Sequence, residues 1–462
     1  MPAAAGLRAR ASGSAGPGGG ARSRPAAAKG LEHRVLLTAT LCLLAFGAVM
    51  VYSASSATSL LQGRGNGSGY LVKYLIYGAI GLVLMRVLAR DGVTRVKAAV
   101  GPLLAVSFVL VLAVHVPHIG VSVNGARRWL GPGPFQFQPS ELMKLALLLY
   151  GATLLAQRPA RVHDLRELAR PLLVVVGGAS VLIASQPDIG TAMVIVLTTA
   201  ALLAAAGIPM RKLGLLAGGV LALVVMYALV RPYARTRMTS FLNPWAHAAG
   251  SGFQAVQGQI AIGSGGLLGV GPGESVQKIF YLPEAPTDFI LAVIAEELGV
   301  VGVSALLFLY GLIGYAGLRA ARGARSLYSA LIAVGVTCLI LSQALLNVFA
   351  VLGMAPLTGV PLPFVSYGSS SLIVMLAAMG LLLNVAAGGT AHVRAVDAPR
   401  RSSRGAARRP SRAPVRQSSA DVARAKSTRW GGGRSVEQGR DRSRRDRGAR
   451  GSRAGGGRRA TG

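Results

Sequence analysis

The sequence predicts an all-α, polytopic membrane protein with about ten transmembrane helices. Of its 462 residues, 52% are hydrophobic and only 14% are charged. The apolar residues gather in runs, many of them close to the roughly 20 residues that a helix needs to cross a bilayer. A soluble helical protein would instead alternate apolar and polar faces. The two cysteines, Cys42 and Cys338, lie in apolar runs, so no disulfide framework is expected.

The expected spans follow one another along the chain. Their approximate bounds are 35–55, 71–88, 98–116, 140–157, 170–185, 189–207, 213–230, 288–317, 327–353 and 364–387. Arginine and lysine recur in the connections between spans 2 and 3, 4 and 5, 6 and 7, and 8 and 9. These connections lie on the same side as the basic segments at both ends of the chain. Because cytoplasmic loops carry the excess of Lys and Arg, both termini are predicted to be cytoplasmic.

Basic segments with little apolar content flank the membrane domain. Residues 1–33 and 391–462 contribute much of the formal net charge of +33. Segments of this composition cannot bury a core, so both are predicted to be disordered cytoplasmic tails, with 34–390 as the membrane domain. Nucleic-acid binding is one interpretation of an Arg-rich tail. Attraction to anionic lipid is the stronger one, so no nucleic acid is expected as a partner.

Two connections on the predicted outer side are exceptional, 117–139 and about 231–287. The first contains Arg127 and Arg128, and the second contains Arg231, Arg235, Arg237 and Lys278. The second connection is far longer than usual, and loops of that length are commonly functional. Its glycine-rich run, Gly263–Gly273, lacks the Lys-Ser/Thr ending of a P-loop. We interpret it as flexible backbone that can approach a ligand closely.

Carboxylates in or beside apolar runs mark the candidate sites, because they are costly in hydrocarbon and usually face protein or water. Asp288 is at the outer mouth of span 8, beside the two arginine-bearing connections. This place suits a lipid-linked anion whose phosphate is bound by arginine, with the carboxylate taking a proton from an acceptor hydroxyl. From the residues alone, a transporter and an enzyme acting on a lipid-linked substrate both remain open.

Other charged residues in apolar surroundings have both structural and functional interpretations. Glu141 and Lys144 are three residues apart and can meet on one helix face, either as a buried ion pair that fixes packing or as a pair that orients a substrate groove. Asp188 either caps span 6 or belongs to a site. Of Glu296 and Glu297, inside span 8, one is expected to pair with an arginine, and neither is the preferred catalyst.

Six segments resemble, in order and spacing, the motifs of the SEDS family (shape, elongation, division and sporulation), over roughly residues 33–390. They are NGARRWL, FQPSELMK, QPDIGTAMV, GQIAIGSGGLLGVGPGES, LPEAPTDFILAVIAEELG and PLPFVSYGSSS. Asn124 before Gly-Ala-Arg-Arg-Trp looks more like the division branch (FtsW type) than the elongation branch (RodA type). Pro286 stands where histidine is common and Ser369 where glycine is usual, and both departures leave the acidic residue in place.

The resemblance implies a ten-span peptidoglycan glycosyltransferase that polymerises lipid II into β-1,4 glycan on the outer face of the bacterial cytoplasmic membrane, at the division septum for the FtsW type. Asp288 matches the family's essential loop aspartate and is the expected catalytic residue. Glu141 and Lys144 match its intramembrane pair. The remaining candidates for substrate binding are Arg127, Asp188, Arg237, Glu296, Ser366 and Ser370.

No cofactor is required by the sequence, and no dedicated set of metal ligands is present, although a divalent cation (Mg or Mn) would fit between carboxylates and pyrophosphate. The expected partners are a class B penicillin-binding protein and other divisome proteins. A lipid II flippase is the main alternative, but it would place its key charges near the membrane midplane. A RodA-type elongation polymerase is a second alternative, and a scaffold that tolerates loss of Asp288 is a third.

Overall fold

The computed structural model describes residues 26–63, 66–123, 126–131, 136–157, 165–230, 232–279 and 281–389. All of them lie within one compact unit, residues 1–399. The second unit, Arg400–Gly462, lies outside the described residues, as do the rest of the tail predicted at 391–462 and residues 1–25. Residues 26–33, which were predicted to belong to the first disordered tail, are helical instead, and Glu32 is buried and pairs with Arg319 (2.9 Å).

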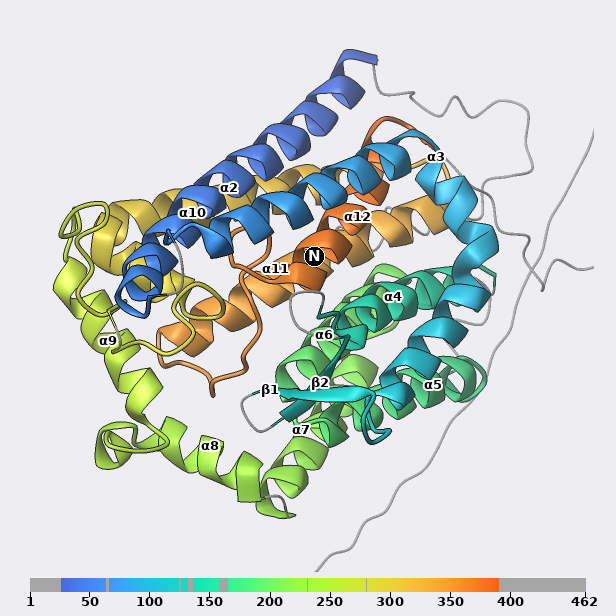
Figure 1. Cartoon of the computed structure of the whole chain (residues 1–462). Helices are drawn as coiled ribbons and strands as arrows, with labels where there is room; N and C mark the ends of the chain where they lie inside the picture. Colours follow the sequence, from blue (N-terminus) through green and yellow to red (C-terminus); the bar gives the residue numbers. More distant parts are fainter. Residues whose placement is uncertain are drawn as a thin grey trace, which may run out of the picture. The chain divides into compact units, whose positions relative to one another are not determined.

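Helices dominate the described residues, as the apolar runs predict (Figure 1). In chain order they are α2 (Ala26–Leu61), α3 (Gly69–Ala113), α4 (Pro139–Gln157), α5 (Leu165–Ser185), α6 (Ile189–Ala205), α7 (Met210–Val230), α8 (Pro232–Leu242), the 3₁₀ turn η2 (Trp245–His247), α9 (Phe253–Gly265), α10 (Ile290–Gly323), α11 (Leu327–Val351) and α12 (Ser369–Ala386). Between α3 and α4 lies an antiparallel hairpin of β1 (Gly120–Val123) and β2 (Ala126–Leu130), which the sequence analysis did not predict.

Each expected span overlaps one of these helices, which supports a polytopic membrane protein. In the described part of the chain, α2, α3, α4, α10, α11 and α12 are long and apolar enough to cross a membrane. α3 covers the second expected span and most of the third, and its backbone leaves helical geometry between them at Asp91 (φ −132°, ψ 20°). Shorter apolar helices cover Pro171–Ser185 and Ile189–Ala205. The count of ten spans stays a prediction.

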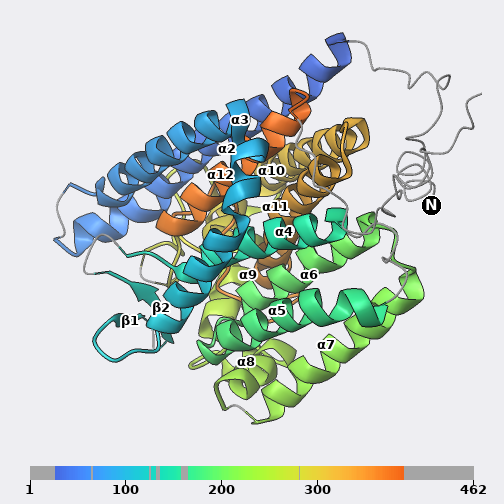
Figure 2. The same cartoon turned by 90° about the vertical axis from the view of Figure 1, so that its right-hand side faces the viewer.

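α11 lies at the centre of the bundle and contacts α4, α6, α10 and α12. α12 packs along α3, and α2 packs along α10 (Figure 2). Lipid is as apolar as the helices, so close packing and polar contacts must hold such a bundle together. Gly380 of α12 illustrates the packing, because a Cβ there would lie 2.5 Å from the carbonyl oxygen of Met85 in α3.

The long connection expected at 231–287 is partly helical, since it contains α8, η2 and α9. α9 packs on α10 and buries Val256 and Ala261. At Gly258 the two come so close that a Cβ would lie 2.7 Å from the ring of Phe289. The glycines within α9 weaken its apolar periodicity, which is why the sequence pattern did not predict a helix here.

The glycine-rich run is packed against an interruption in α10. At Gly299 the helix leaves helical geometry (φ 63°, ψ −160°). In an unbroken helix the N–H groups of Val300 and Val301 would donate to carbonyls four residues back. Here Val300 donates to the carbonyl of Gly266 (3.1 Å) and Val301 to that of Leu267 (3.2 Å). The glycine-rich run therefore accepts the donors that the interruption exposes.

The same run also supplies donors to the other side of the interruption. The carbonyl of Glu296 accepts from the N–H of Val270 (2.9 Å), and the carbonyl of Glu297 accepts from the N–H of Gly271 (3.1 Å). Buried backbone groups in folded proteins are nearly always paired. The run and the interruption thus satisfy each other's backbone hydrogen bonds.

This fit requires glycine at the points of closest approach. A Cβ on Gly265 would lie 1.9 Å from the carbonyl oxygen of Ala295. A Cβ on Gly269, which has φ +83°, would lie 2.1 Å from that of Glu297. The sequence analysis predicted a close approach to a ligand. Among the described residues, the close approach is to the backbone of α10.

We expect Gly269→Ala to lower the thermal unfolding midpoint in detergent, because the new methyl group meets backbone and the φ angle disfavours any side chain. The expected cost is about 2 kcal/mol or more. Gly263→Ala is the matched control, since a Cβ at this position within α9 meets nothing within 4 Å. Alanine should stabilise that helix slightly. Equal midpoints for the two variants would contradict the packing described here.

Candidate functional site

Asp288 lies in the turn that leads directly into α10, and its side chain is half-buried. The amide nitrogen of Asn347, on α11, donates to the backbone carbonyl of Asp288 (2.7 Å) and to that of Val360 (2.8 Å). The Oγ1 atom of Thr287 lies 3.2 Å from Oδ1 of Asp288 and 3.0 Å from Oε2 of Glu284. The aspartate is therefore fixed by α11 and lies close to a second carboxylate.

Burial raises the pKa of Asp288 to about 6, and the negative charge of Glu284 adds to the increase. Hydrogen bonds from the backbone and from Thr287, together with the positive charge of Arg237, act in the opposite direction and lower the pKa. A carboxyl group of this pKa is mostly ionised at neutral pH. It is also a better proton acceptor than an ordinary aspartate, as a general base requires.

Arg128 brings positive charge to the same place. Oδ2 of Asp288 and Nη1 of Arg128 both lie within 4 Å of the point where a Cβ would stand on Gly359 (3.8 and 3.9 Å). Gly359 has φ +68°, a conformation that favours glycine. Arg128 is half-buried and donates from Nε to the carbonyl of Gln186 (3.1 Å) and from Nη2 to that of Pro187. A carboxylate and a guanidinium group thus flank a position that has no side chain.

Asp188 positions this arginine. Its Oδ1 lies 3.9 Å from Nη1 of Arg128 and accepts from the N–H of Thr191 (3.3 Å), so it caps α6. Its Oδ2 accepts from Nε2 of Gln138 (2.9 Å) and from the hydroxyl of Ser140 (3.1 Å). The carboxylate is almost completely buried. It connects β2, α4 and α6 at a single point.

Arg237, on α8, is the second arginine near Asp288. Its Nη1 donates to the carbonyl of Leu357 (2.7 Å), in the segment between α11 and α12 that also contains Gly359. A cavity of about 310 Å³ lies beside it, and its lining includes Ser240 and Gln259. Arg237 therefore adds positive charge on the α8 side of the aspartate.

The two adjacent arginines of the hairpin have different surroundings. Arg127 is exposed and lies opposite Ser122 in the hairpin, whereas Arg128 faces Asp188 and the space beside Gly359. Side chains of successive strand residues point to opposite faces. Recognising the strand would therefore have indicated that only one of the two arginines can face the site. Arg127 is the residue expected from the sequence, and its role in substrate binding stays a prediction.

Glu141 and Lys144 form a buried ion pair on α4. The Nζ atom of Lys144 lies 2.9 Å from each carboxylate oxygen and donates to Oε1 of Gln343 on α11 (2.6 Å). The amide nitrogen of Gln343 donates to the carbonyl of Pro361 (2.9 Å) and to the hydroxyl of Ser371 (3.1 Å). The pair therefore connects α4, α11 and the start of α12.

The two predicted serines are buried at the start of α12 and before it. Oγ of Ser370 accepts from the N–H of Gln138 (2.8 Å), and Oγ of Ser366 accepts from the N–H of Leu362 (2.8 Å). Ser370 thereby connects α12 to the residue before α4. Ser366 closes the turn that precedes α12.

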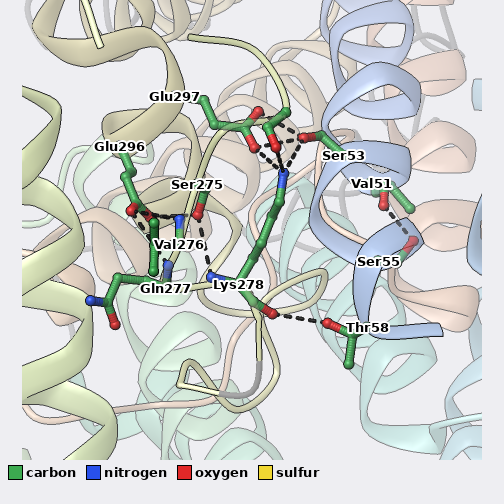
Figure 3. A network of polar contacts seen from close by, with 11 residues as sticks. Val51, Ser53, Ser55, Thr58, Ser275, Val276, Gln277, Lys278, Glu296 and Glu297 are labelled. Carbon is green, nitrogen blue, oxygen red and sulfur yellow. Dashed lines mark hydrogen bonds and ion pairs between the residues drawn. The ribbon is translucent and has the colours of Figure 1, made fainter. Parts of the chain in front are cut away.

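Glu296 and Glu297 bind the segment that follows the glycine-rich run (Figure 3). Glu297 forms a buried ion pair with Lys278 (2.7 Å) and accepts from the hydroxyl of Ser53 on α2 (2.6 Å). Glu296 accepts from the hydroxyl of Ser275. The basic partner is thus a lysine, where the sequence analysis expected an arginine. Which basic residue pairs with Glu297 depends on how the long connection folds back on α10. The spacing of residues in the sequence does not show that fold.

Comparisons with known proteins agree with this architecture. Residues 34–390 match the FtsW/RodA/SpoVE family model, which is described as cell cycle protein. The chain is 42% identical over 355 residues to a probable peptidoglycan glycosyltransferase FtsW of Coxiella burnetii, covering 76% of this chain and 95% of that one. It is 40% identical over 352 residues to stage V sporulation protein E of Bacillus subtilis, covering 76% of this chain and 96% of that one.

Two solved structures are also similar. One is described as structural coordination of polymerization and crosslinking by a peptidoglycan synthase complex. It has a TM-score of 0.63 at 30% identity and covers 76% of this chain and 96% of that chain. The other is the rod shape determining protein RodA of Thermus thermophilus, with a TM-score of 0.56 at 31% identity, covering 76% and 95%.

We expect Asp288→Asn to raise the thermal unfolding midpoint at pH 7.5. The pKa of Asp288 is about 6 in the folded protein and 3.8 ordinarily. The neutral, protonated side chain therefore favours the folded state. This stabilisation is full below pH 4 and is lost as the pH rises through 6, whereas asparagine is neutral at every pH. After allowance for the solvent that reaches this half-buried group, the gain is about 1–2 kcal/mol. The difference from wild type should shrink at pH 4.5.

Asp188→Asn provides a contrast of opposite sign, because it removes the charge that faces Arg128 and weakens the cap of α6. It should lower the midpoint by an amount equivalent to about 1–2 kcal/mol.

If Asp288→Asn were destabilised to the same degree at both pH values, burial would not be what opposes ionisation of Asp288.

Proposed function

Because this chain belongs to the FtsW/RodA/SpoVE family of cell cycle proteins, we propose that it is a peptidoglycan glycosyltransferase that polymerises lipid II into β-1,4 glycan strands. The observation that carries the mechanism is that Oδ2 of Asp288 and Nη1 of Arg128 both lie within 4 Å of the point where a Cβ would stand on Gly359. One group can accept a proton and the other can bind an anion, and the position between them has no side chain.

Asp288 is the general base of the proposed reaction. It takes the proton from the 4-hydroxyl of the acceptor sugar as that oxygen attacks C1 of the donor. The bond between C1 and the pyrophosphate oxygen breaks, and inversion converts an α-linked donor into a β-linked product. General-base assistance typically contributes about 10²–10⁴-fold to a rate. The pKa of about 6 keeps Asp288 ionised at neutral pH, so it is ready to accept the proton.

The arginines stabilise the leaving group. Undecaprenyl pyrophosphate departs as an anion, and guanidinium groups bind phosphate in a bidentate manner. Arg128 and Arg237 approach Asp288 from β2 and α8, so they are the residues we assign to this charge. A divalent cation, Mg or Mn, would add further positive charge on the pyrophosphate.

The membrane arrangement belongs to the same proposal. Ten spans with both termini in the cytoplasm place 117–139, 231–287 and Asp288 on the outer face of the bacterial cytoplasmic membrane. The basic residues of the alternate connections support this orientation. We assign the protein to the division septum, where its partners would be a class B penicillin-binding protein and other divisome proteins. Asn124, on which the division assignment depends, lies outside the described residues.

The position of the charges favours a polymerase over a flippase. Asp288 precedes α10, and Arg128 belongs to the hairpin between α3 and α4, so both lie in connections. A transporter would place its key charges near the membrane midplane. The charged residues that do lie inside a helix, such as Glu141 and Lys144, are already paired with each other. An elongation role of the RodA type is the alternative within the family.

We expect Asp288→Asn to reduce glycan formation by about 100-fold or more, because it removes the proton acceptor. The measurement is polymerisation of labelled lipid II by the purified full-length protein with its cognate class B partner, with products separated by size. An unfolding midpoint at least as high as that of wild type shows that the variant is folded. Polymerisation at the wild-type rate would refute the assignment of Asp288.

The two hairpin arginines can be tested against each other in the same assay. The geometry predicts that Arg128→Gln lowers kcat/KM by about 10²-fold, the usual effect of losing a group that stabilises developing charge. Arg127→Gln should change it by about threefold or less. Arg128→Lys, which retains the charge, should recover part of the loss. A larger loss from Arg127→Gln than from Arg128→Gln would instead favour the residue chosen from the sequence.

A further inference from the structure

The hydroxyl of Thr287 lies within hydrogen-bond distance of the carboxylates of both Glu284 and Asp288. The hydroxyl oxygen of Thr287 lies 3.2 Å from Oδ1 of Asp288 and 3.0 Å from Oε2 of Glu284. A hydroxyl has one hydrogen to donate and lone pairs that accept, so it can pass a proton between two carboxyl groups. We propose that Thr287 and Glu284 form a relay that carries the proton taken up by Asp288 to solvent. This inference rests on the proposed function.

Glu284 has an unusual backbone conformation. Its φ angle is +57°, in the left-handed region that few residues other than glycine adopt. Its carbonyl accepts from the N–H of Thr287 (3.1 Å) and from the hydroxyl of Thr287 (2.9 Å). Glycine would adopt this turn without strain. A glutamate held there at a cost is the kind of outlier that marks a functional position.

A polar cavity provides the exit. Its volume is about 350 Å³, and Glu284, which is exposed, lies on its wall. The rest of the lining includes Ser55 and Thr58 of α2 and Tyr70 of α3. A cavity of this size with several hydroxyl groups suits water. Arg128, which we assign to the anionic leaving group, comes from β2 of the hairpin. The proton would instead leave into a cavity lined by α2 and α3.

The relay accounts for the proton that the reaction leaves on Asp288. Each sugar transfer leaves one proton on Asp288, which must be lost before the next transfer. The protonated carboxyl donates to Oγ1 of Thr287 while the hydroxyl hydrogen of Thr287 passes to Glu284, and Glu284 releases the proton to water in the cavity. The other groups around Asp288 are Arg128 from β2, Arg237 from α8 and the amide of Asn347 from α11. None of them accepts a proton at neutral pH.

The first test removes the hydroxyl. In the lipid II assay with the full-length protein and its class B partner, Thr287→Val should lower kcat by about tenfold or more, with little change in KM. Thr287→Ser should restore most of the loss, and the solvent deuterium isotope effect on kcat should differ between Thr287→Val and wild type. Thr239→Val is the matched control, because its exposed hydroxyl bonds only within α8. Full kcat in Thr287→Val would overturn the relay.

The second test separates a relay from simple charge repulsion. Neutralising Glu284 lowers the pKa of Asp288, so the acidic limb of the pH–kcat profile should move to lower pH in Glu284→Gln. The relay also predicts a plateau about tenfold or more below wild type. A shifted limb with an unchanged plateau would mean that Glu284 acts only through its charge, and the relay would be wrong.

Asp288→Asn, measured in the same assay, distinguishes a failure of the relay from a failure of the proposed general base. If this variant is inactive while Thr287→Val and Glu284→Gln reach the wild-type plateau, the relay fails and the proposed base stands. If Asp288→Asn polymerises lipid II normally, the proposed base fails and the relay fails with it. Unfolding midpoints of all variants identify any loss of rate that comes from misfolding.

Discussion

The interruption of α10 at Gly299 is the constraint on which the outer part of the molecule depends. A break in a membrane helix exposes backbone donors and acceptors that lipid cannot satisfy, so protein must cover them. Here the glycine-rich run does so through hydrogen bonds in both directions, to Val300 and Val301 and from the carbonyls of Glu296 and Glu297. The long connection, which also packs on α10 through α9, is thereby fixed to α10 at the interruption. Asp288 lies in the chain between the glycine-rich run and the first residue of α10.

Two buried carboxylates extend this attachment. Glu297 pairs with Lys278, and Glu296 accepts from Ser275, so the segment after the glycine-rich run is held by charge as well as by backbone. Removing one member of a buried pair usually costs far more than the pair contributes as a whole. These contacts give the acidic residues within this membrane helix a structural role, and a role of Glu296 in substrate binding stays a prediction. They restrict where the turn that contains Asp288 can lie.

The sequence was sufficient for features that depend on local spacing. Runs of apolar residues predicted the helices, and a separation of three residues predicted that Glu141 and Lys144 could meet, as they do. The position of Asp188 before an apolar run predicted a helix cap. Each of these follows from the period of an α-helix or the chemistry of its ends, so a short window of sequence contains the necessary information.

Features that depend on tertiary contacts could not be predicted in this way. The choice between Arg127 and Arg128 requires knowing that a hairpin lies between α3 and α4. The partner of Glu297 is a lysine brought near by the glycine-rich run, whose own contact with α10 involves backbone atoms that no residue pattern reveals. The conformation of Glu284, at positive φ, is likewise set by its surroundings. All three concern residues in connections, where position is decided by what the chain packs against.

The amide of Asn347 has a mechanical consequence for the reaction centre. It donates to the carbonyl of Asp288 and to that of Val360, the residue after Gly359. A single side chain of α11 thus supports both the carboxylate and the glycine beside it, and any shift of that helix displaces the two together. Arg128 is attached elsewhere, to the junction of α5 and α6. The distance between base and cation is therefore set by how the start of α6 packs against the segment before α12, where a Cβ on Gly190 would lie 2.4 Å from the side chain of Val360.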